Sequence, residues 1–343
     1  MPLHMAVLGG HGWLGRAVVA AARRRRVTVT VVSRRPGPGA VAADTADTAS
    51  LAAALCRADV VVNAAGYRGG DADVAAEANS ELPDRLGWLA ARSGWRLVHL
   101  GSAAEYGPSA AGPSLITEDH GCLPTSVYGM SKLAGTRAVL RWRARGAAVV
   151  VARVFNVVDH DLPGENPFHG IAVQVRQVAQ SGGPGDVGIG DPTTIRDVGR
   201  RATLAAAIVD LAAAGAVPGA TAGDAPGATP GGGSPATAPP HPIVNICTGR
   251  PTSFGDLAEA MARHLGVQVN VLDLGWPRGG RIVGDPTLLR GLVPLAPPDR
   301  LADLAASILG LPAAASTGPS PAPSTPPSTT PDTATDELTG EHR

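Results

Sequence analysis

The stretch Met5-Ala-Val-Leu-Gly-Gly-His-Gly-Trp-Leu-Gly15 decides the fold of this 343-residue chain. Its first four residues are apolar and predict a short buried strand, and residues 16–25 suit a helix. Three glycines spaced three apart let the backbone turn tightly and approach a pyrophosphate at the N-terminus of that helix. The alternative is a structural turn in a chain with 44 glycines. The dinucleotide-binding residues expected here are Gly9, Gly12, Trp13, Leu14 and Gly15.

The end of the second strand bears on which dinucleotide is bound. Residues 27–32 are almost all β-branched, which predicts a strand buried on both faces, and Ser33-Arg34-Arg35 follows. An acidic residue at this point would bind the ribose of NAD, whereas Ser33 and Arg34 suit the 2′-phosphate of NADP. We therefore expect NADP as the cofactor, with NAD as the alternative. The other interpretation of Arg34 and Arg35 is that they are solvated charges in a loop. Asp44 is expected either to reach the adenine amino group or to cap the next helix.

The β-α alternation continues through residue 153. A buried strand over 59–63 ends in the small residues Ala64, Ala65 and Gly66, which would let the backbone line the cofactor. A helix is expected over 79–92, a strand over 97–102, a helix from about 126 to 145 and a strand over 147–153. This alternation predicts an α/β Rossmann fold, a doubly wound parallel sheet with a smaller C-terminal substrate domain.

A second set of polar residues falls on the same edge of the predicted sheet. Ser102 stands at the carboxyl end of its strand, where open parallel sheets bind ligands. Tyr128 and Lys132 are four residues apart, so both side chains project from one face of a helix. A lysine ammonium beside a phenol favours the phenolate, which lets the tyrosine exchange a proton with a carbonyl or alcohol oxygen near neutral pH. Ser102 is expected to hydrogen-bond the same oxygen.

The remaining segments complete the predicted domain organisation. Residues 1–155 are expected to form the NAD(P)-binding domain, and 156–312 a substrate-binding region interleaved with the last Rossmann elements. Helices are expected over 171–180, 253–265 and 299–309, and a strand over 267–272. Residues 213–242, rich in Ala, Gly and Pro, predict a disordered insertion, and the Ser/Thr/Pro-rich residues 313–343 predict a disordered tail.

Taken together, these motifs resemble the extended short-chain dehydrogenase/reductase family, the NAD(P)-dependent epimerases, dehydratases and reductases of nucleotide sugars. The resemblance covers most of residues 5–310. The motifs that carry it are the Gly9/Gly12/Gly15 loop, Asp44, Asn63-Ala-Ala-Gly66, Ser102-Ala-Ala-Glu-Tyr-Gly107, Tyr128-Gly-Met-Ser-Lys132, Arg153-Val-Phe-Asn156, Arg196-Asp197 and Asn245-Ile-Cys-Thr-Gly249.

The resemblance implies a role for each matching residue. Tyr128 would be the acid/base, Lys132 would bind the nicotinamide ribose and tune Tyr128, and Ser102 would orient the substrate oxygen. Asn156 would contact the substrate, its alternative being a turn residue, and Arg196 suits bidentate pairing with a diphosphate. The resemblance also implies a nucleotide-sugar substrate and a homodimer packed through helices that include the one bearing Tyr128.

Two alanines bear on the reaction. Dehydratases of this family carry an Asp-Glu pair directly after the serine or threonine, but Ala103 and Ala104 stand here. Glu105 is one residue out of phase and is expected to point elsewhere. Dehydration is thus disfavoured, and the segment looks most like reductases of GDP- or dTDP-4-keto-6-deoxyhexoses. The alternatives are a redox-neutral epimerase with tightly held NAD and a non-catalytic dinucleotide-binding protein. Residues 157–160, directly after Asn156, replace the family's Gly-Pro, which predicts a reshaped substrate loop.

Composition excludes several other classes of protein. The chain has 29 basic and 29 acidic residues, which argues against broad nucleic-acid or membrane-surface binding. Its three cysteines are widely spaced, show no metal-ligand pattern and suggest reduced thiols, so no metal is expected and the cytoplasm is the expected compartment. No signal peptide is visible, and no apolar run approaches the roughly 20 residues of a transmembrane helix.

Overall fold

The computed structural model describes residues 2–35, 37, 39–108, 114–214 and 241–312. The chain divides into two units, Met1–Ala313 and Ala314–Arg343, and all that follows concerns the first. The predicted tail, and all of the predicted insertion except residues 213, 214, 241 and 242, lie outside the described residues. The predicted domain boundary after residue 155 stays a prediction.

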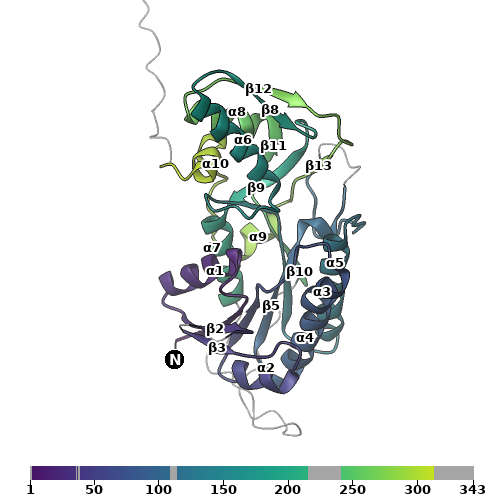
Figure 1. The fold of residues 1–343 in the computed structure, drawn as a ribbon. Helices are drawn as coiled ribbons and strands as arrows, with labels where there is room; N and C mark the ends of the chain where they lie inside the picture. The colour runs from purple at the N-terminus through teal and green to yellow at the C-terminus, as the bar shows by residue number, and fades with distance from the viewer. Residues whose placement is uncertain (1, 36, 38, 109–113, 215–240, 313–343) are drawn as a thin grey trace, which may run out of the picture. The chain divides into compact units, whose positions relative to one another are not determined.

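Among the described residues, seven parallel strands form the central sheet in the order β3-β2-β1-β4-β5-β6-β10 (Figure 1). This order, in which the chain moves outward from β1 in both directions, is that of a doubly wound Rossmann sheet and confirms the predicted fold class. In the order of the sheet, the strands are β3 (Ala40–Ala42), β2 (Thr28–Ser33), β1 (His4–Leu8), β4 (Val60–Asn63), β5 (Arg96–Ser102), β6 (Val149–Val154) and β10 (Ile243–Ile246).

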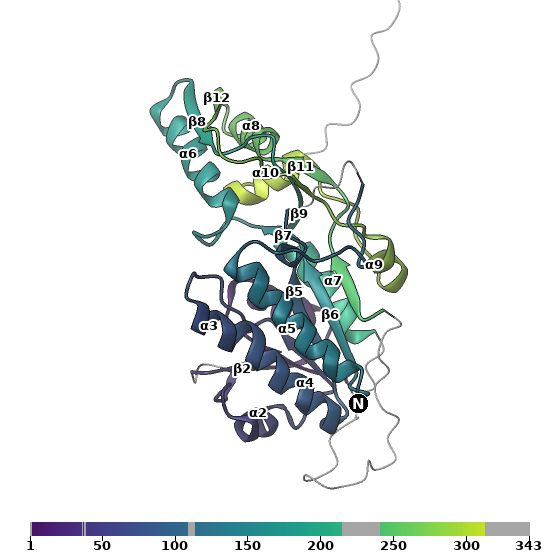
Figure 2. The ribbon, with the colours of Figure 1, turned by 90° about the vertical axis from the view of Figure 1, so that its right-hand side faces the viewer.

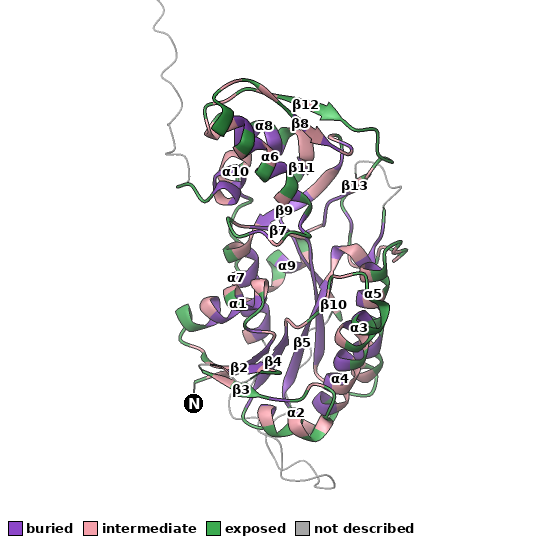
Figure 3. Ribbon diagram, viewed as in Figure 1, coloured by how far each residue is buried: buried purple, intermediate pink, exposed green. Residues whose placement is uncertain are grey.

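Helices cover both faces of this sheet (Figures 1 and 2). One buried cluster joins the sheet to α1 and α7, and another joins it to α2, α4 and α5. Strands covered on both sides must be apolar throughout, which is why β4 begins with three fully buried valines and appears buried in Figure 3. The helices of this part are α1 (Trp13–Arg24), α2 (Thr48–Leu55), α3 (Ala72–Ala76), α4 (Leu82–Ser93), α5 (Val127–Arg143) and α7 (Arg201–Ala213).

The helix predicted over 79–92 begins earlier than expected. Asp71 caps α3 by accepting hydrogen bonds from the amides of Asp73 and Val74, so the helix starts at Ala72. A π-helical turn, Glu77–Glu81, leads directly into α4. Pro83 is accommodated because it lies in the first turn of α4. The amphipathic pattern alone did not reveal this composite helix.

The C-terminal half contains a third buried cluster under smaller sheets. Helix α6 begins four residues before the predicted 171, because Asn166 caps it and Pro167 suits its first turn. The sheets are β11-β9-β13 with β7 beside β9, and β12-β8. The elements are β7 (Asn156–Val158), α6 (Pro167–Ser181), β8 (Gly185–Ile189), β9 (Ile195–Arg200), β11 (Pro251–Ser253), α8 (Phe254–His264), β12 (Val269–Asp273), β13 (Arg281–Ile282), α9 (Thr287–Leu292) and α10 (Leu301–Leu309).

Within the described residues, none of the helices combines the length and apolar character that crossing a bilayer requires.

Candidate functional site

The glycine loop between β1 and α1 has the close contacts that its spacing predicts. Gly9 has a φ of +70°, and its carbonyl accepts a hydrogen bond from the Gly12 amide at 2.8 Å. A Cβ at Gly15 would lie 2.1 Å from the Gly9 oxygen, and one at Gly9 would lie 2.7 Å from Ala65. Larger residues would therefore force β1, α1 and the end of β4 apart.

The N-terminus of α1 suits an anion. Gly12 is its N-cap and offers no side chain to the first-turn amides, and that turn contains no acidic residue. The amides and the positive end of the helix dipole therefore favour a phosphate here. Leu14 packs against the buried cluster under the sheet.

The loop after β4 is fixed by two asparagines. Asn63 accepts the amide of Ala65 at 3.2 Å. Asn79 is fully buried and bonds both main-chain groups of Tyr67, at 2.9 and 2.7 Å, while its amide also donates to Ser131 Oγ at 2.9 Å. It projects from the π-helical turn and thus ties the small-residue loop, Ala64 to Gly66, to the helix that carries Tyr128. No motif or spacing in the sequence marks Asn79 as part of the site.

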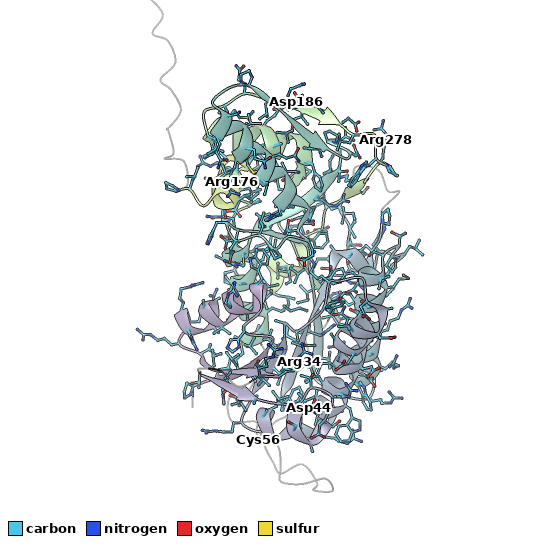
Figure 4. All side chains as sticks on the ribbon, viewed as in Figure 1. Arg34, Asp44, Cys56, Arg176, Asp186 and Arg278 are labelled. Carbon is cyan, nitrogen blue, oxygen red and sulfur yellow. The ribbon has the colours of Figure 1, made fainter. Side chains whose placement is uncertain are left out.

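Arg34 and Asp44 come from the part of the chain around β2 and β3 (Figure 4). Arg34 is exposed directly after β2, and Ser33 Oγ accepts the amide of Arg35 at 3.3 Å. The alternative role of Asp44 as a helix cap is wrong, because Asp47 caps α2 and Asp44 instead accepts the Ala46 amide. Contact of Asp44 with adenine stays a prediction.

Lys132 lies buried beneath the carboxyl end of β5. Ser126 caps α5 by accepting the Gly129 amide, so Lys132 falls in the second turn. Its Nζ donates to the Leu100 carbonyl at 2.6 Å, and the residue is 4% exposed. Burial lowers the pKa of Lys132 to about 8, and the negative charge of Glu105 opposes that change. Its ammonium is thus held against the strand that ends at Ser102.

Tyr128 is more open than Lys132. It is half-buried in the first turn of α5, and the exposed Arg68 places its guanidinium carbon 5.3 Å from the ring centroid. Ser102 Oγ accepts the Ala104 amide at 3.2 Å. Ser102 ends β5 and Tyr128 is the second residue of α5, so both belong to the carboxyl edge of the sheet, where the glycine loop after β1 also lies.

Glu105 points into the protein, as its register predicts. It is fully buried, one carboxylate oxygen accepts the Ser102 amide at 2.8 Å, and the other accepts Arg153 Nε at 2.9 Å. The two residues at the dehydratase positions, Ala103 and Ala104, carry no titratable group.

The predicted substrate residues also have structural contacts. Asn156 donates to the Asp197 carbonyl at 3.0 Å and thereby joins β7 to β9. Arg196 donates to three main-chain carbonyls, which belong to Ile195, Gly279 and Gly280. Contact of Asn156 or Arg196 with substrate stays a prediction. Asp197 is buried and bonds Thr248 and Gly249, and burial raises its pKa to about 6.

An ionic cluster not expected from the sequence ties the segment after β7 to α1. Asp161 accepts the Trp13 indole N–H at 2.9 Å and pairs with Arg16 and Arg201. Arg201 also pairs with Asp159 at 2.7 Å and lies over the Trp13 ring. Ligand atoms of Asp159, His160 and Asp161 lie within 4.8 Å of one another, but Arg201 pairs with both carboxylates. Asp161, which directly follows residues 157–160, thus joins this segment to the glycine-loop helix.

Comparison with known proteins adds independent findings. Residues 5–220 match the model of the NAD dependent epimerase/dehydratase family. The chain is 32% identical over 292 residues to dTDP-6-deoxy-L-talose 4-dehydrogenase (NAD(P)(+)) from Kitasatospora kifunensis, covering 81% of this chain and 84% of that protein. It is 30% identical over 224 residues to dTDP-4-dehydrorhamnose reductase from Mycobacterium tuberculosis, covering 62% and 66%.

Solved structures share the fold. RMD from Pseudomonas aeruginosa, solved with NADPH, superposes with a TM-score of 0.70 at 22% identity, covering 90% of this chain and 97% of that one. UDP-N-acetylglucosamine 4-epimerase from Bacillus cereus gives a TM-score of 0.69 at 18% identity, covering 92% and 99%. At these identities the likeness concerns the fold.

Proposed function

The chain belongs to the NAD-dependent epimerase/dehydratase family, and from that membership we propose that it is an NADPH-dependent ketoreductase of a nucleotide-activated 4-keto-6-deoxyhexose. One observation carries the proposal. Ser102 ends β5, Tyr128 and Lys132 lie in the first two turns of α5, and Lys132 Nζ bonds the Leu100 carbonyl of β5, while Ala103 and Ala104 replace the groups that dehydration needs. The proton-handling residues of a reductase are thus present without those of a dehydratase.

The residues of the glycine loop fit a dinucleotide. Side chains at Gly9 or Gly15 would clash with neighbouring backbone, and the first turn of α1 offers its amides to a phosphate. Ser33 and Arg34 would hold the 2′-phosphate of NADP at the end of β2. When bound, the dinucleotide would supply the hydride that reduces the keto carbon.

Tyr128 would donate its phenolic proton to the oxygen of the reacting carbonyl. A serine hydroxyl has one donor and two acceptor sites, and the Ala104 amide occupies an acceptor site of Ser102. The Ser102 hydroxyl would then donate its own proton in a hydrogen bond to the same substrate oxygen. The buried Lys132 ammonium would favour the phenolate that remains on Tyr128 after transfer.

The names of two relatives support the substrate class. One acts on a dTDP-6-deoxy-L-talose and the other on dTDP-4-dehydrorhamnose, so both handle the C4 position of a dTDP-linked deoxyhexose. A reductase of a 4-keto-6-deoxyhexose nucleotide, in specialised glycoside biosynthesis, is the function that this substrate class and the two alanines together favour.

The test is incubation of the chain with NADPH or NADH and a panel of dTDP- and GDP-4-keto-6-deoxyhexoses. We expect oxidation of NADPH in proportion to reduced sugar formed, measured by loss of the reduced-nicotinamide absorbance. An epimerase would instead carry NAD through purification and interconvert sugars without net oxidation of NADPH. That result would contradict the proposal.

A further inference from the structure

We propose that Glu105 is a positioning residue of this site: its buried carboxylate pairs with Arg153 and fixes the main chain of Ser102, at the end of the strand to which Lys132 is bonded. Glu105 is fully buried, so it is not placed to contact substrate itself. The inference rests on the proposed function, because positioning matters here only if Ser102 and Tyr128 act on a substrate.

The first contact is with Ser102. The Ser102 amide donates to Glu105 Oε1 at 2.8 Å, while Ser102 Oγ accepts an amide of the following turn, which together form a reciprocal capping box. A Cβ at Gly101 would lie 2.6 Å from the same carboxylate oxygen. Gly101 therefore leaves room for the carboxylate beside the strand. The amide and the hydroxyl of Ser102 are both hydrogen-bonded to the turn that follows it.

The second contact is with Arg153, whose Nε donates to Glu105 Oε2 at 2.9 Å. The guanidinium lies 4.5 Å from the Tyr106 ring, and the Tyr106 hydroxyl donates to Asn245 at 2.7 Å. Arg153 belongs to β6 and Asn245 to β10, so the carboxylate is framed by the two strands beyond β5. A carboxylate framed in this way keeps one geometry.

The third relationship is electrostatic and concerns Lys132. Burial lowers the pKa of Lys132 to about 8, and the charge of Glu105 opposes this lowering. His99 on β5 is a second group coupled to Lys132, because burial and the Lys132 charge hold its pKa well below its ordinary value. Tyr128 lies one turn before Lys132 on α5, and Arg153 pairs with Glu105. Among the groups that affect Lys132, Glu105 favours its ammonium.

The chain itself offers a direct probe, because Lys132 is its single lysine. Protein grown with lysine labelled with carbon-13 at Cε gives one lysine signal, whose pH titration reports the charge of Lys132. We expect a midpoint near 8 in the parent protein. In Glu105→Gln we expect a midpoint lower by about 1 pH unit, because an opposing charge has been removed and Arg153 is left unpaired.

A control carboxylate that pairs with an arginine exists in the same chain, with an arginine side chain that is 43% exposed where that of Arg153 is 3% exposed. Asp299 is also buried, with one oxygen accepting Arg200 Nε at 2.5 Å and the other accepting the Arg200 amide at 3.3 Å. Asp299→Asn therefore removes the same kind of contacts away from Ser102. We expect it to leave the lysine midpoint and kcat unchanged, although its melting temperature falls as it does in Glu105→Gln.

The kinetic arm uses the keto-sugar that the parent protein reduces. We expect Glu105→Gln to lower kcat roughly ten- to a hundredfold with little change in KM, because Ser102 is displaced relative to the reacting oxygen. Glu105→Asp keeps the negative charge, but its side chain is one methylene shorter and holds the carboxylate farther from Ser102. The titration midpoint of Lys132 should therefore match that of the parent protein, while kcat falls. If Glu105→Asp has the kcat of the parent protein, the proposal is overturned. This test applies even if Glu105→Gln does not fold.

The two proposals fail in distinguishable ways. If the parent protein reduces no sugar of the panel, the proposed function is wrong, while the lysine titration still tests the role of Glu105. If Glu105→Gln and Asp299→Asn share the parental midpoint, or lower kcat equally, Glu105 is merely a structural residue and the inference is overturned.

Discussion

The Nζ of Lys132 donates to the carbonyl oxygen of Leu100 at 2.6 Å, which joins the helix carrying Tyr128 to the strand that ends at Ser102. A rise of one residue in a strand is about 3.3 Å, so this bond fixes the lysine close to the predicted reaction centre. The bond also explains how a cation can be buried there, since the carbonyl oxygen accepts a hydrogen bond from the ammonium.

Reduction is expected to slow as the pH rises through about 8. Burial lowers the pKa of Lys132 to that value, so the ammonium is present below it and is lost above it. Without the ammonium, the phenolate on Tyr128 is less favoured and proton transfer slows. The measurement is the pH dependence of kcat. Lys132→Arg stays charged throughout this range, so a folded variant should not show the fall of kcat above about pH 8. If the fall persists in this variant, a group other than Lys132 causes it.

Tyr128→Phe is expected to reduce kcat by roughly 10²- to 10⁴-fold, because the variant has no proton to give to the carbonyl oxygen. Binding of NADPH, followed by quenching of tryptophan fluorescence, should be preserved, since the ring and the helix cap remain. Full turnover in this variant would refute the assigned role of Tyr128.

Gly15→Ala is expected to abolish dinucleotide binding or folding, because the new Cβ would lie 2.1 Å from the Gly9 carbonyl oxygen. Gly170 in α6 is the control glycine, since a Cβ there meets no atom within 4 Å. Gly170→Ala should bind NADPH normally. Its free energy of unfolding should exceed that of the parent protein by about 0.5–1 kcal/mol, because alanine loses less conformational entropy than glycine in a helix. Both effects are measured by NADPH titration and urea unfolding, and equal behaviour of the two variants would contradict the predicted loop.

Arg34→Asp is expected to shift preference from NADPH to NADH. The substituted carboxylate would repel a 2′-phosphate and accept hydrogen bonds from ribose hydroxyls. The readout is the ratio of kcat/KM for the two cofactors. Arg35→Asp tests the neighbouring position. If this variant shifts the kcat/KM ratio and Arg34→Asp does not, the phosphate contact belongs to Arg35 and the prediction for Arg34 is wrong.

Much of the fold could be predicted because its signals are local. The apolar run before Gly9, the glycine spacing and the valines of β4 each express a requirement of the adjacent backbone, and the sheet order confirms the doubly wound fold. Element boundaries were less predictable where capping decided them, as at Asp71, which caps a helix that begins seven residues before the expected residue 79.

The candidate site divides in the same way. Ser102, Tyr128 and Lys132 were identified from their positions on a strand end and a helix face. Asn79 was not, because its partners Tyr67 and Ser131 are reached across a loop and a second helix. Helical spacing carries no information about such contacts.

By itself, the sequence determined the Rossmann fold, and it predicts the dinucleotide loop and the candidate proton-transfer residues, since backbone conformation and strand-end position depend on neighbours along the chain. Tertiary structure alone decided that Glu105 pairs with Arg153 behind Ser102, and that Asp161 reaches Trp13 across 148 positions. The physical reason is that ion pairs and buried hydrogen bonds depend on distance in space, and only packing of the strands and helices sets that distance.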